Sequence, residues 1–257
     1  MDTFAEISCY NPDKEKAVAS MDRAFEEMRR VERLCSKFDD KSELFKINNL
    51  AGKEKAKVSP EMFSLIGRSI DYSVITDGAF DITAEIGKKG RYKKISLDKE
   101  NYTVYFLEED IKIDLGGIAK GYAVDKAKDI LLADGIIDVL VNIGGNIFAA
   151  GNPPDRDNWR IGIRDPENKN NIIDRIELKD QAVATSGNYE RPSHVIDPAS
   201  GASVTSGGSV TIVAGSAEKA DVLSTAVFVK GPEGINAILK AFKDIKIIES
   251  STKAPEK

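Results

Sequence analysis

Asp221 and Thr225 are the two side chains of this sequence most suited to holding a metal ion. They lie four positions apart in a segment, residues 217–229, that we predict to be a helix. Residues at positions i and i+4 project from the same face of a helix, so the carboxylate and the hydroxyl would point the same way. Hard oxygen ligands of this kind suit Mg²⁺. Alone, this spacing is more typical of an ordinary surface pair, and it indicates a metal site only if other segments converge on it.

The stretch Asp114-Leu-Gly-Gly-Ile-Ala-Lys-Gly-Tyr-Ala-Val-Asp125 has the pattern of an anion-binding turn. It separates an extended pattern over residues 102–113 from a helical pattern over residues 118–132, so its glycine pair is expected where a strand turns into a helix. The first four N–H groups of a helix have no backbone partners, and glycine lets a diphosphate approach them. Lys120 would add a positive charge in the first helical turn, where a cation is otherwise unfavourable. A glycine pair used only for tight packing remains an alternative.

Two further segments carry candidate binding or catalytic side chains. Ala79, Phe80 and Asp81 directly follow a glycine turn at residues 76–78, and together they could bound an aromatic ligand. Such strings also occur in ordinary turns. His194 is the only histidine in the protein, and a neutral imidazole can accept a proton near pH 7. A lone histidine is more often structural or solvated, so neither segment assigns a function by itself.

Strand and helix patterns alternate along the chain without a regular βαβ period. Strand patterns occur at residues 4–10, 138–143 and 209–214, with helical patterns between and after them. The sequence therefore predicts a mixed α+β fold rather than a doubly wound parallel sheet. We expect one compact unit over residues 1–250 and a charged, disordered tail at residues 251–257.

The composition excludes several classes of protein. The chain has 257 residues and a net charge of −5, and its lysines are interspersed with acids, so it has no basic patch for nucleic acid. The sequence has no apolar run long enough to span a bilayer. The two cysteines, Cys9 and Cys35, have neither metal-ligand spacing nor a disulfide framework, and they leave the cellular compartment open. An anionic ligand would need local donors or a metal ion.

Six short segments form an ordered series along the chain. They are Thr76-Asp-Gly-Ala-Phe-Asp-Ile-Thr83, Asp114-Leu-Gly-Gly-Ile-Ala-Lys-Gly-Tyr-Ala-Val-Asp125, Asn142-Ile-Gly-Gly-Asn146, Thr185-Ser-Gly-Asn-Tyr-Glu-Arg191, His194-Val-Ile-Asp-Pro198 and Ala220-Asp-Val-Leu-Ser-Thr-Ala226. In this order they closely resemble the motifs of the ApbE family, the FAD:protein FMN transferases. The likeness covers nearly the whole chain, beginning at Met1-Asp-Thr-Phe, which is similar to the family's Met-Gly-Thr start. Six ordered motifs argue against coincidence.

The resemblance implies a fold, a reaction and its cofactors. The fold would be an ApbE-like arrangement of mixed sheets with packed helices, similar to a T-fold. FAD, the substrate, would be bound with its diphosphate on Mg²⁺. A Ser or Thr hydroxyl of an acceptor protein would attack the FMN phosphorus and release AMP, leaving the acceptor covalently flavinylated. Acceptors of this family include subunits of membrane redox pumps and related electron-transfer proteins.

The family pattern also implies roles for individual residues. The metal ligands match the side chains of Asp221 and Thr225 and the backbone carbonyl of Ala119. His194 matches a histidine thought to assist proton transfer from the attacking hydroxyl, and Asp221 is the other residue on which the chemistry would depend. The positions that contact FAD in the family are here Met1, Phe38, Ala79, Phe80, Asp81, Gly117, Lys120 and Ile196.

The sequence departs from the family pattern in two segments. Where residues 84–91 stand here, the family usually carries a longer segment with a proline and a tryptophan. A hairpin normally precedes the histidine, whereas only two residues separate Arg191 from His194. In addition, Ala199 replaces a family arginine. If these segments cover the flavin or grip the acceptor, this protein would hold the isoalloxazine ring more openly or choose its acceptor differently.

Two other functions remain open alternatives. Shorter lid segments would admit water, and the site would then hydrolyse FAD to FMN and AMP. A non-catalytic FAD-binding protein is the second alternative, although a carrier would need no proton acceptor beside a metal. The family's location is commonly extracytoplasmic and membrane-anchored, so we expect membrane association through a region preceding Met1. A cytoplasmic protein is the alternative, which the sequence itself also fits.

Overall fold

The computed structural model describes residues 3–84, 88–168, 170–188, 195–204 and 207–250. Its helices are α1 (Lys14–Cys35), α2 (Glu43–Asn49), α3 (Pro60–Ile75), the 3-10 helix η2 (Arg91–Lys94), α4 (Gly116–Ala133), α5 (Ala217–Lys230) and α6 (Pro232–Ala241). Its strands are β1 (Ala5–Tyr10), β2 (Ala56–Lys57), β3 (Ile95–Asp98), β4 (Thr103–Phe106), β5 (Asp138–Ile143), β6 (Asn146–Ala150), β7 (Trp159–Arg164), β8 (Ile172–Leu178), β9 (Gln181–Gly187), β10 (Ser209–Ala214) and β11 (Lys246–Ser250). Among these helices, none combines the length and the apolar character needed to cross a membrane. The predicted tail, residues 251–257, lies outside the described residues.

The main sheet has six strands in the order β1-β5-β6-β9-β10-β11, and every neighbouring pair is antiparallel. Gly144 and Gly145 join β5 to β6, with φ angles of 57° and 91° that side chains rarely allow. The glycine pair is therefore a two-residue hairpin turn. The antiparallel order agrees with the predicted α+β class.

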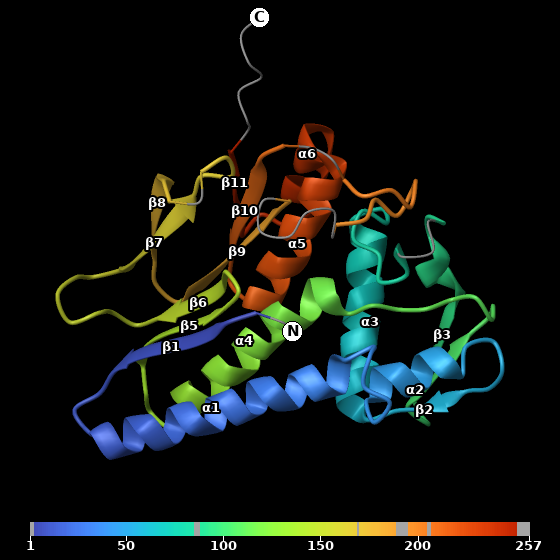
Figure 1. The fold of residues 1–257 in the computed structure, drawn as a ribbon, viewed down its shortest axis with the longest axis horizontal. Helices are drawn as coiled ribbons and strands as arrows, with labels where there is room; N and C mark the ends of the chain where they lie inside the picture. The colour runs from blue at the N-terminus through green and yellow to red at the C-terminus, as the bar shows by residue number, and fades with distance from the viewer. Residues whose placement is uncertain (1–2, 85–87, 169, 189–194, 205–206, 251–257) are drawn as a thin grey trace, which may run out of the picture.

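The two faces of this sheet are covered by different elements. In β9 and β10, Ala184 and Ile212 belong to the apolar cluster that contains α4 and α5. Val183 and Val213 belong instead to a separate cluster with the β7–β8 hairpin. Because successive side chains of a strand alternate between faces, Ser186 of β9 lies on the helix-covered side. Figure 1 shows α4 and α5 beside the sheet.

Helices α2 and α3 and the small sheet β2-β4-β3 form a second layer beside α4 (Figure 1). Leu44 of α2, Leu65 of α3 and Val104 of β4 are buried in the same apolar cluster as α4 and α5. One continuous core therefore joins both layers, as expected for a single compact unit.

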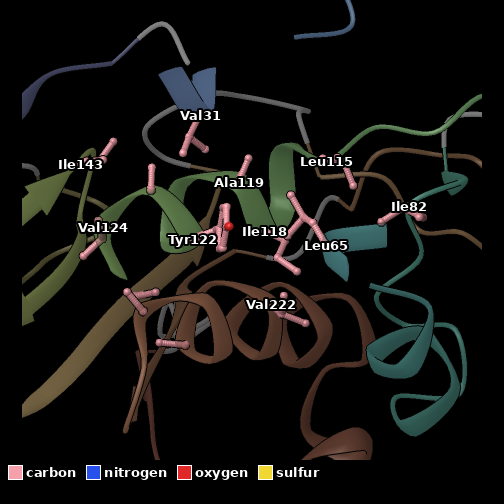
Figure 2. Close-up of a cluster of buried hydrophobic side chains, with 14 of the residues drawn as sticks. Val31, Leu65, Ile82, Leu115, Ile118, Ala119, Tyr122, Val124, Ile143 and Val222 are labelled. Atoms are coloured by element: carbon pink, nitrogen blue, oxygen red, sulfur yellow. The ribbon is translucent and has the colours of Figure 1, made fainter. Parts of the chain in front are cut away.

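Helix α4 lies at the centre of this core. Figure 2 shows Val31 of α1, Leu65 of α3 and Val222 of α5 around its side chains. Packing from several directions fixes the position of this helix. The buried residues of α4 are Ile118, Ala119, Gly121, Tyr122, Ala123, Val124, Ala127 and Leu131.

The strand predicted over residues 102–113 is too long. β4 covers only Thr103–Phe106, and the chain then reaches α4 without regular structure. The amide side chain of Asn48 takes the place of a partner strand: its Nδ2 donates to the Ile113 carbonyl at 2.9 Å, and its Oδ1 accepts the Ile113 N–H at 2.9 Å. These bonds satisfy a buried backbone outside any sheet.

The Glu61 carboxylate links three helices on another side of α4. It accepts two hydrogen bonds of 2.7 Å from the Arg30 guanidinium and one of 2.7 Å from the Tyr122 hydroxyl. The hydrogen bonds from Arg30, with a smaller contribution from Tyr122, lower the pKa of Glu61 against the opposing effect of burial.

We expect Glu61→Gln to lower the free energy of unfolding by about 1 kcal/mol at neutral pH, because the charge that Arg30 binds is lost. A carboxylate whose pKa is lowered in the folded state contributes stability above its unfolded pKa, and this contribution disappears as the pH falls through the folded value. The difference in the free energy of unfolding between wild type and variant should therefore become smaller below pH 4.5, the ordinary pKa of a glutamate. Urea titrations at neutral and acidic pH measure it, and a pH-independent difference would contradict the assignment.

Candidate functional site

Helices α4 and α5 are in close contact at Gly121. A Cβ atom on Gly121 would lie 2.2 Å from the Ala217 carbonyl oxygen and 2.8 Å from Glu218 Cα, so only glycine fits without a shift of one helix. One turn later in α4, the Asp125 carboxylate accepts the N–H groups of Ala217 and Glu218 at 2.9 Å each. This cap holds the start of α5 against α4. The contact determines which side chains of α5 face α4.

Asp221 of α5 is the buried charge at this contact, with 4% of its surface exposed. One of its oxygens accepts the Gly121 N–H at 3.0 Å, and both lie 3.4 Å from the Lys120 ammonium. Burial raises the pKa of Asp221, and Lys120 together with hydrogen bonds from Gly121 and the Asn146 side chain opposes this rise. A further cation at this position would favour the ionised form of the carboxylate.

Thr225 lies one turn after Asp221 and next to the start of α4. Its hydroxyl oxygen lies within hydrogen-bond distance of two groups, the Asp221 carbonyl at 3.2 Å and the Ser186 hydroxyl of β9 at 3.3 Å. The position of a Cβ on Gly117 would be 3.9 Å from Thr225 Oγ1. The structure thus brings the predicted metal-binding pair of α5 to the glycine turn of α4.

The first turn of α4 has fewer free donors than the sequence predicts. Asp114 accepts the Gly116 N–H at 2.7 Å and forms an ion pair of 2.7 Å with Lys37. The N–H groups of Ile118 and Ala119 both donate to the Leu115 carbonyl, at 3.0 and 2.8 Å. Of the four N–H groups before the first α-helical bond, at residues 115–118, those of Gly116 and Ile118 have partners, and in the described part of the chain those of Leu115 and Gly117 have none. The expectation of four outward N–H groups is therefore wrong.

The position of Lys120 also differs from the prediction. Because α4 begins at Gly116, two residues earlier than expected, Lys120 is its fifth residue and lies in the second turn. Its ammonium donates to the Gly116 carbonyl at 2.9 Å and lies beside Asp221. Side chains of a helix point back toward its N-terminus, so Lys120 still delivers its charge to the start of α4.

Ala79, Phe80 and Asp81 form a buried turn against α4, with exposed fractions of 5%, 4% and 8%. A Cβ on Gly117 would meet the Phe80 ring at 3.1 Å, so glycine permits this contact. Asp81 Oδ1 accepts the backbone N–H and the hydroxyl of Thr83 at 2.8 and 2.6 Å. Burial raises the pKa of Asp81, although the bonds from Thr83 oppose the rise. This carboxylate stabilises the turn that holds Phe80 beside Gly117.

The remaining predicted FAD contacts are less closely tied to this group. Phe38 is 84% exposed, and it follows Lys37, the residue paired with Asp114 at the start of α4. Ile196 forms an isolated antiparallel bridge with Ser203. Met1 and His194 lie outside the described residues.

Four residues of the site were not predicted as site residues from the sequence. The Asn146 side chain opposes the rise in the pKa of Asp221, and Asp125 caps α5. The hydroxyls of Ser186 and Ser224 lie 2.9 Å apart, next to Thr225. All four residues fall inside the motifs quoted above, so the signal was present, but their side-chain partners lie in segments distant along the chain.

The residues present fit a hard divalent cation. Asp221 offers a carboxylate, Thr225 a hydroxyl and Ala119 a main-chain carbonyl, and α4 and α5 are packed together where these residues lie. An all-oxygen donor set with one carboxylate matches the preference of Mg²⁺, which usually retains water and binds substrate phosphates. The geometry can therefore support charge neutralisation of a diphosphate beside the start of α4.

A family model settles the classification of this chain. The model of the ApbE family matches residues 1–89 and 84–248. This chain belongs to the ApbE family. Among curated ApbE-family relatives, the FAD:protein FMN transferase of Klebsiella pneumoniae strain 342 is 29% identical, over 94% of this chain and 84% of its own length. The FAD:protein FMN transferase of Vibrio cholerae is 31% identical, over 89% of this chain and 78% of its own length.

Solved ApbE structures share the fold. The crystal structure of the ApbE protein from Thermotoga maritima matches with a TM-score of 0.82 and 30% identity, covering 98% of this chain and 93% of that protein. The flavin transferase ApbE from Vibrio cholerae matches with a TM-score of 0.82 and 28% identity, covering 98% and 94%. The predicted ApbE-like α+β fold in one compact unit is confirmed.

Proposed function

We propose that this ApbE-family enzyme transfers FMN from FAD to a Ser or Thr hydroxyl of an acceptor protein and releases AMP, with Mg²⁺ as cofactor. The relatives are named for FAD-dependent FMN transfer to protein. The observation that carries the proposal is the buried Asp221 carboxylate, which lies with Thr225 beside the glycine turn of α4. This arrangement suits a diphosphate substrate bridged to a metal ion.

Asp221, Thr225 and the Ala119 carbonyl would hold Mg²⁺, which would neutralise negative charge on the FAD diphosphate. The Gly117 N–H has no partner among the described residues, so it could donate a hydrogen bond to a phosphate oxygen. Lys120 brings a second positive charge to the same side of the helix start. Phosphoryl transfer depends mainly on positioning and electrostatics, and these groups supply both.

His194 would accept the proton of the attacking hydroxyl. In the transfer, a bond forms between the acceptor oxygen and the FMN phosphorus, and the bond from that phosphorus to the bridging oxygen breaks. The bridging oxygen leaves with AMP. A neutral imidazole is a suitable acceptor for this proton near pH 7. The sequence places His194 after the segment at residues 185–191, whose Ser186 contacts Thr225.

The acceptor would be a flavinylated subunit of a redox pump or another electron-transfer protein. We propose an extracytoplasmic, membrane-anchored enzyme, by resemblance to the family, with a cytoplasmic enzyme as the alternative. Fractionation of cells that produce the full natural protein distinguishes the two locations.

The test is to incubate the enzyme with FAD, Mg²⁺ and an acceptor carrying a flavinylation-type Ser/Thr motif, and to detect covalent flavin by in-gel fluorescence. We expect a fluorescent acceptor, and none when the target Ser/Thr is replaced by Ala or when a chelator removes the metal. Released AMP without labelled acceptor would instead establish FAD hydrolysis. Tight FAD binding without either product would establish a non-catalytic flavin-binding protein.

A further inference from the structure

Three hydroxyls form a connected group behind the Asp221 carboxylate. Ser186 Oγ of β9 lies 2.9 Å from Ser224 Oγ and 3.3 Å from Thr225 Oγ1 of α5. Ser224 Oγ donates to the Asp221 carbonyl at 2.9 Å, and its residue is fully buried, with 0% of its surface exposed. The group therefore links the inner face of the main sheet to the two metal-binding positions of α5.

The available acceptors favour one order of hydrogen bonds among these three hydroxyls, in which Thr225 donates to Ser186 and Ser186 donates to Ser224. The Asp221 carbonyl already accepts the Ser224 hydroxyl and, as the i−4 carbonyl of an α-helix, the Thr225 N–H. A carbonyl has two lone pairs, so the longer 3.2 Å contact from the Thr225 hydroxyl competes for an occupied acceptor. The Ser186 oxygen can instead accept the hydrogen bond from the Thr225 hydroxyl, while the Ser186 hydroxyl donates to Ser224 Oγ.

We propose that Ser186 is a positioning residue for the metal ligand Thr225. Ser186 accepts a hydrogen bond from the Thr225 hydroxyl, which directs that O–H toward β9. Both lone pairs of Thr225 Oγ1 then point away from β9, toward the side where Asp221 and α4 lie. A hydroxyl ligates a cation through a lone pair, so the direction of its proton decides whether it can bind. The inference rests on the proposed metal site.

Ser186 is held rigidly enough for this role. It pairs with Val210 in the register between β9 and β10, one residue before the end of β9. The preceding inward residues of β9, Ala182 and Ala184, are fully buried in the apolar cluster shared with α5. Residues on such packed strands position ligands more accurately than residues on loops.

Titration of the FAD-free enzyme with Mn²⁺ alone, followed by calorimetry, tests the proposal. We expect Ser186→Ala to weaken Mn²⁺ binding about tenfold, as is usual when a partner of a metal ligand is removed. Ser186→Thr, which keeps the hydroxyl, should restore most of the affinity. Thr211→Val is the matched control: it removes a hydroxyl that lies 2.8 Å from Thr185 Oγ1, on the opposite face of the same sheet, and should leave the affinity unchanged.

A second pair of variants separates positioning from a general loss of structure. In a Thr225→Val background the metal ligand has no hydroxyl to orient, so adding Ser186→Ala should cause no further loss of Mn²⁺ affinity. An equal loss in both backgrounds, or unchanged affinity in Ser186→Ala alone, would overturn the proposal while leaving the metal site intact. Wild-type protein that binds no Mn²⁺ would overturn the metal site itself, and the role of Ser186 with it.

Discussion

Asp221→Asn is expected to lower the rate of FMN transfer about a thousandfold, equivalent to about 4 kcal/mol of transition-state stabilisation. The substitution keeps the size of the side chain but removes the charge that would bind Mg²⁺ against the diphosphate. AMP formation should fall by the same factor, because transfer and hydrolysis both cleave the diphosphate. Initial rates at saturating FAD and Mg²⁺, read as released AMP and as covalent flavin on the acceptor, measure the effect.

The fold of this variant should survive. Burial raises the pKa of Asp221, so a neutral side chain removes the cost of burying a charge. We expect the melting temperature of the metal-free variant to lie within about 5 °C of wild type. Asp244→Asn is the matched control, since that carboxylate is 61% exposed and pairs only with Lys219 among the described residues. A wild-type rate in Asp221→Asn, with the acceptor labelled normally, would refute the metal assignment.

Gly121→Ala is expected to destabilise the protein by about 3 kcal/mol. The new Cβ would lie 2.2 Å from the Ala217 carbonyl oxygen and 2.6 Å from its carbon, and backbone atoms cannot move aside as a flexible side chain would. Helices α4 and α5 would have to separate, which would also draw the Gly121 N–H away from Asp221. Urea denaturation measures the stability, and Mn²⁺ titration at a temperature where the variant is folded measures the damage to the site.

Gly67→Ala provides the control for this prediction. Gly67 lies inside α3, and its Cβ would meet Leu97 Cδ1 at 3.7 Å, an ordinary contact. Alanine is the better helix former, so this variant should be as stable as wild type or more stable, by up to about 1 kcal/mol. Equal stability of Gly121→Ala and wild type would show that α4 and α5 do not require this close contact.

Helices and strands could be predicted well where the apolar pattern of the sequence corresponds to the residues that the fold buries. The predicted strands at residues 138–143 and 209–214 have the bounds of β5 and β10, because both are central strands with long apolar runs. The helix predicted at residues 217–229 differs from α5 by one residue. Ser216 gives that helix a clear start, since its hydroxyl accepts the Lys219 N–H.

The predictions were wrong where the backbone bonds to side chains rather than to a regular helix or strand partner. Residues after Phe106 have the composition of a strand, yet the side chain of Asn48 takes both backbone hydrogen bonds of Ile113, and no local sequence pattern predicts such a partner. Helix α4 starts two residues earlier than predicted, at Gly116, whose N–H donates to the Asp114 side chain; glycine pairs usually weaken a helix prediction.

The candidate site could be predicted as a set of motifs but not as an arrangement. Sequence spacing placed Asp221 and Thr225 on one face of a helix, and the structure agrees. Their neighbours Ser186 and Asn146 belong to β9 and β6, and only the packing of the sheet against α5 brings these hydroxyl and amide groups to the proposed metal ligands. The sequence stretch around Lys120 predicted a charge at the helix start, and the structure shows that the charge reaches it from the second turn.

The most direct test of the central claim is the molar ratio of released AMP to flavin covalently bound to the acceptor, measured in one reaction with FAD and Mg²⁺. Transfer through the Asp221 site predicts a ratio of about one, with both products lost together in Asp221→Asn. AMP in large excess over bound flavin would contradict the account, because water rather than the acceptor would then be the main nucleophile.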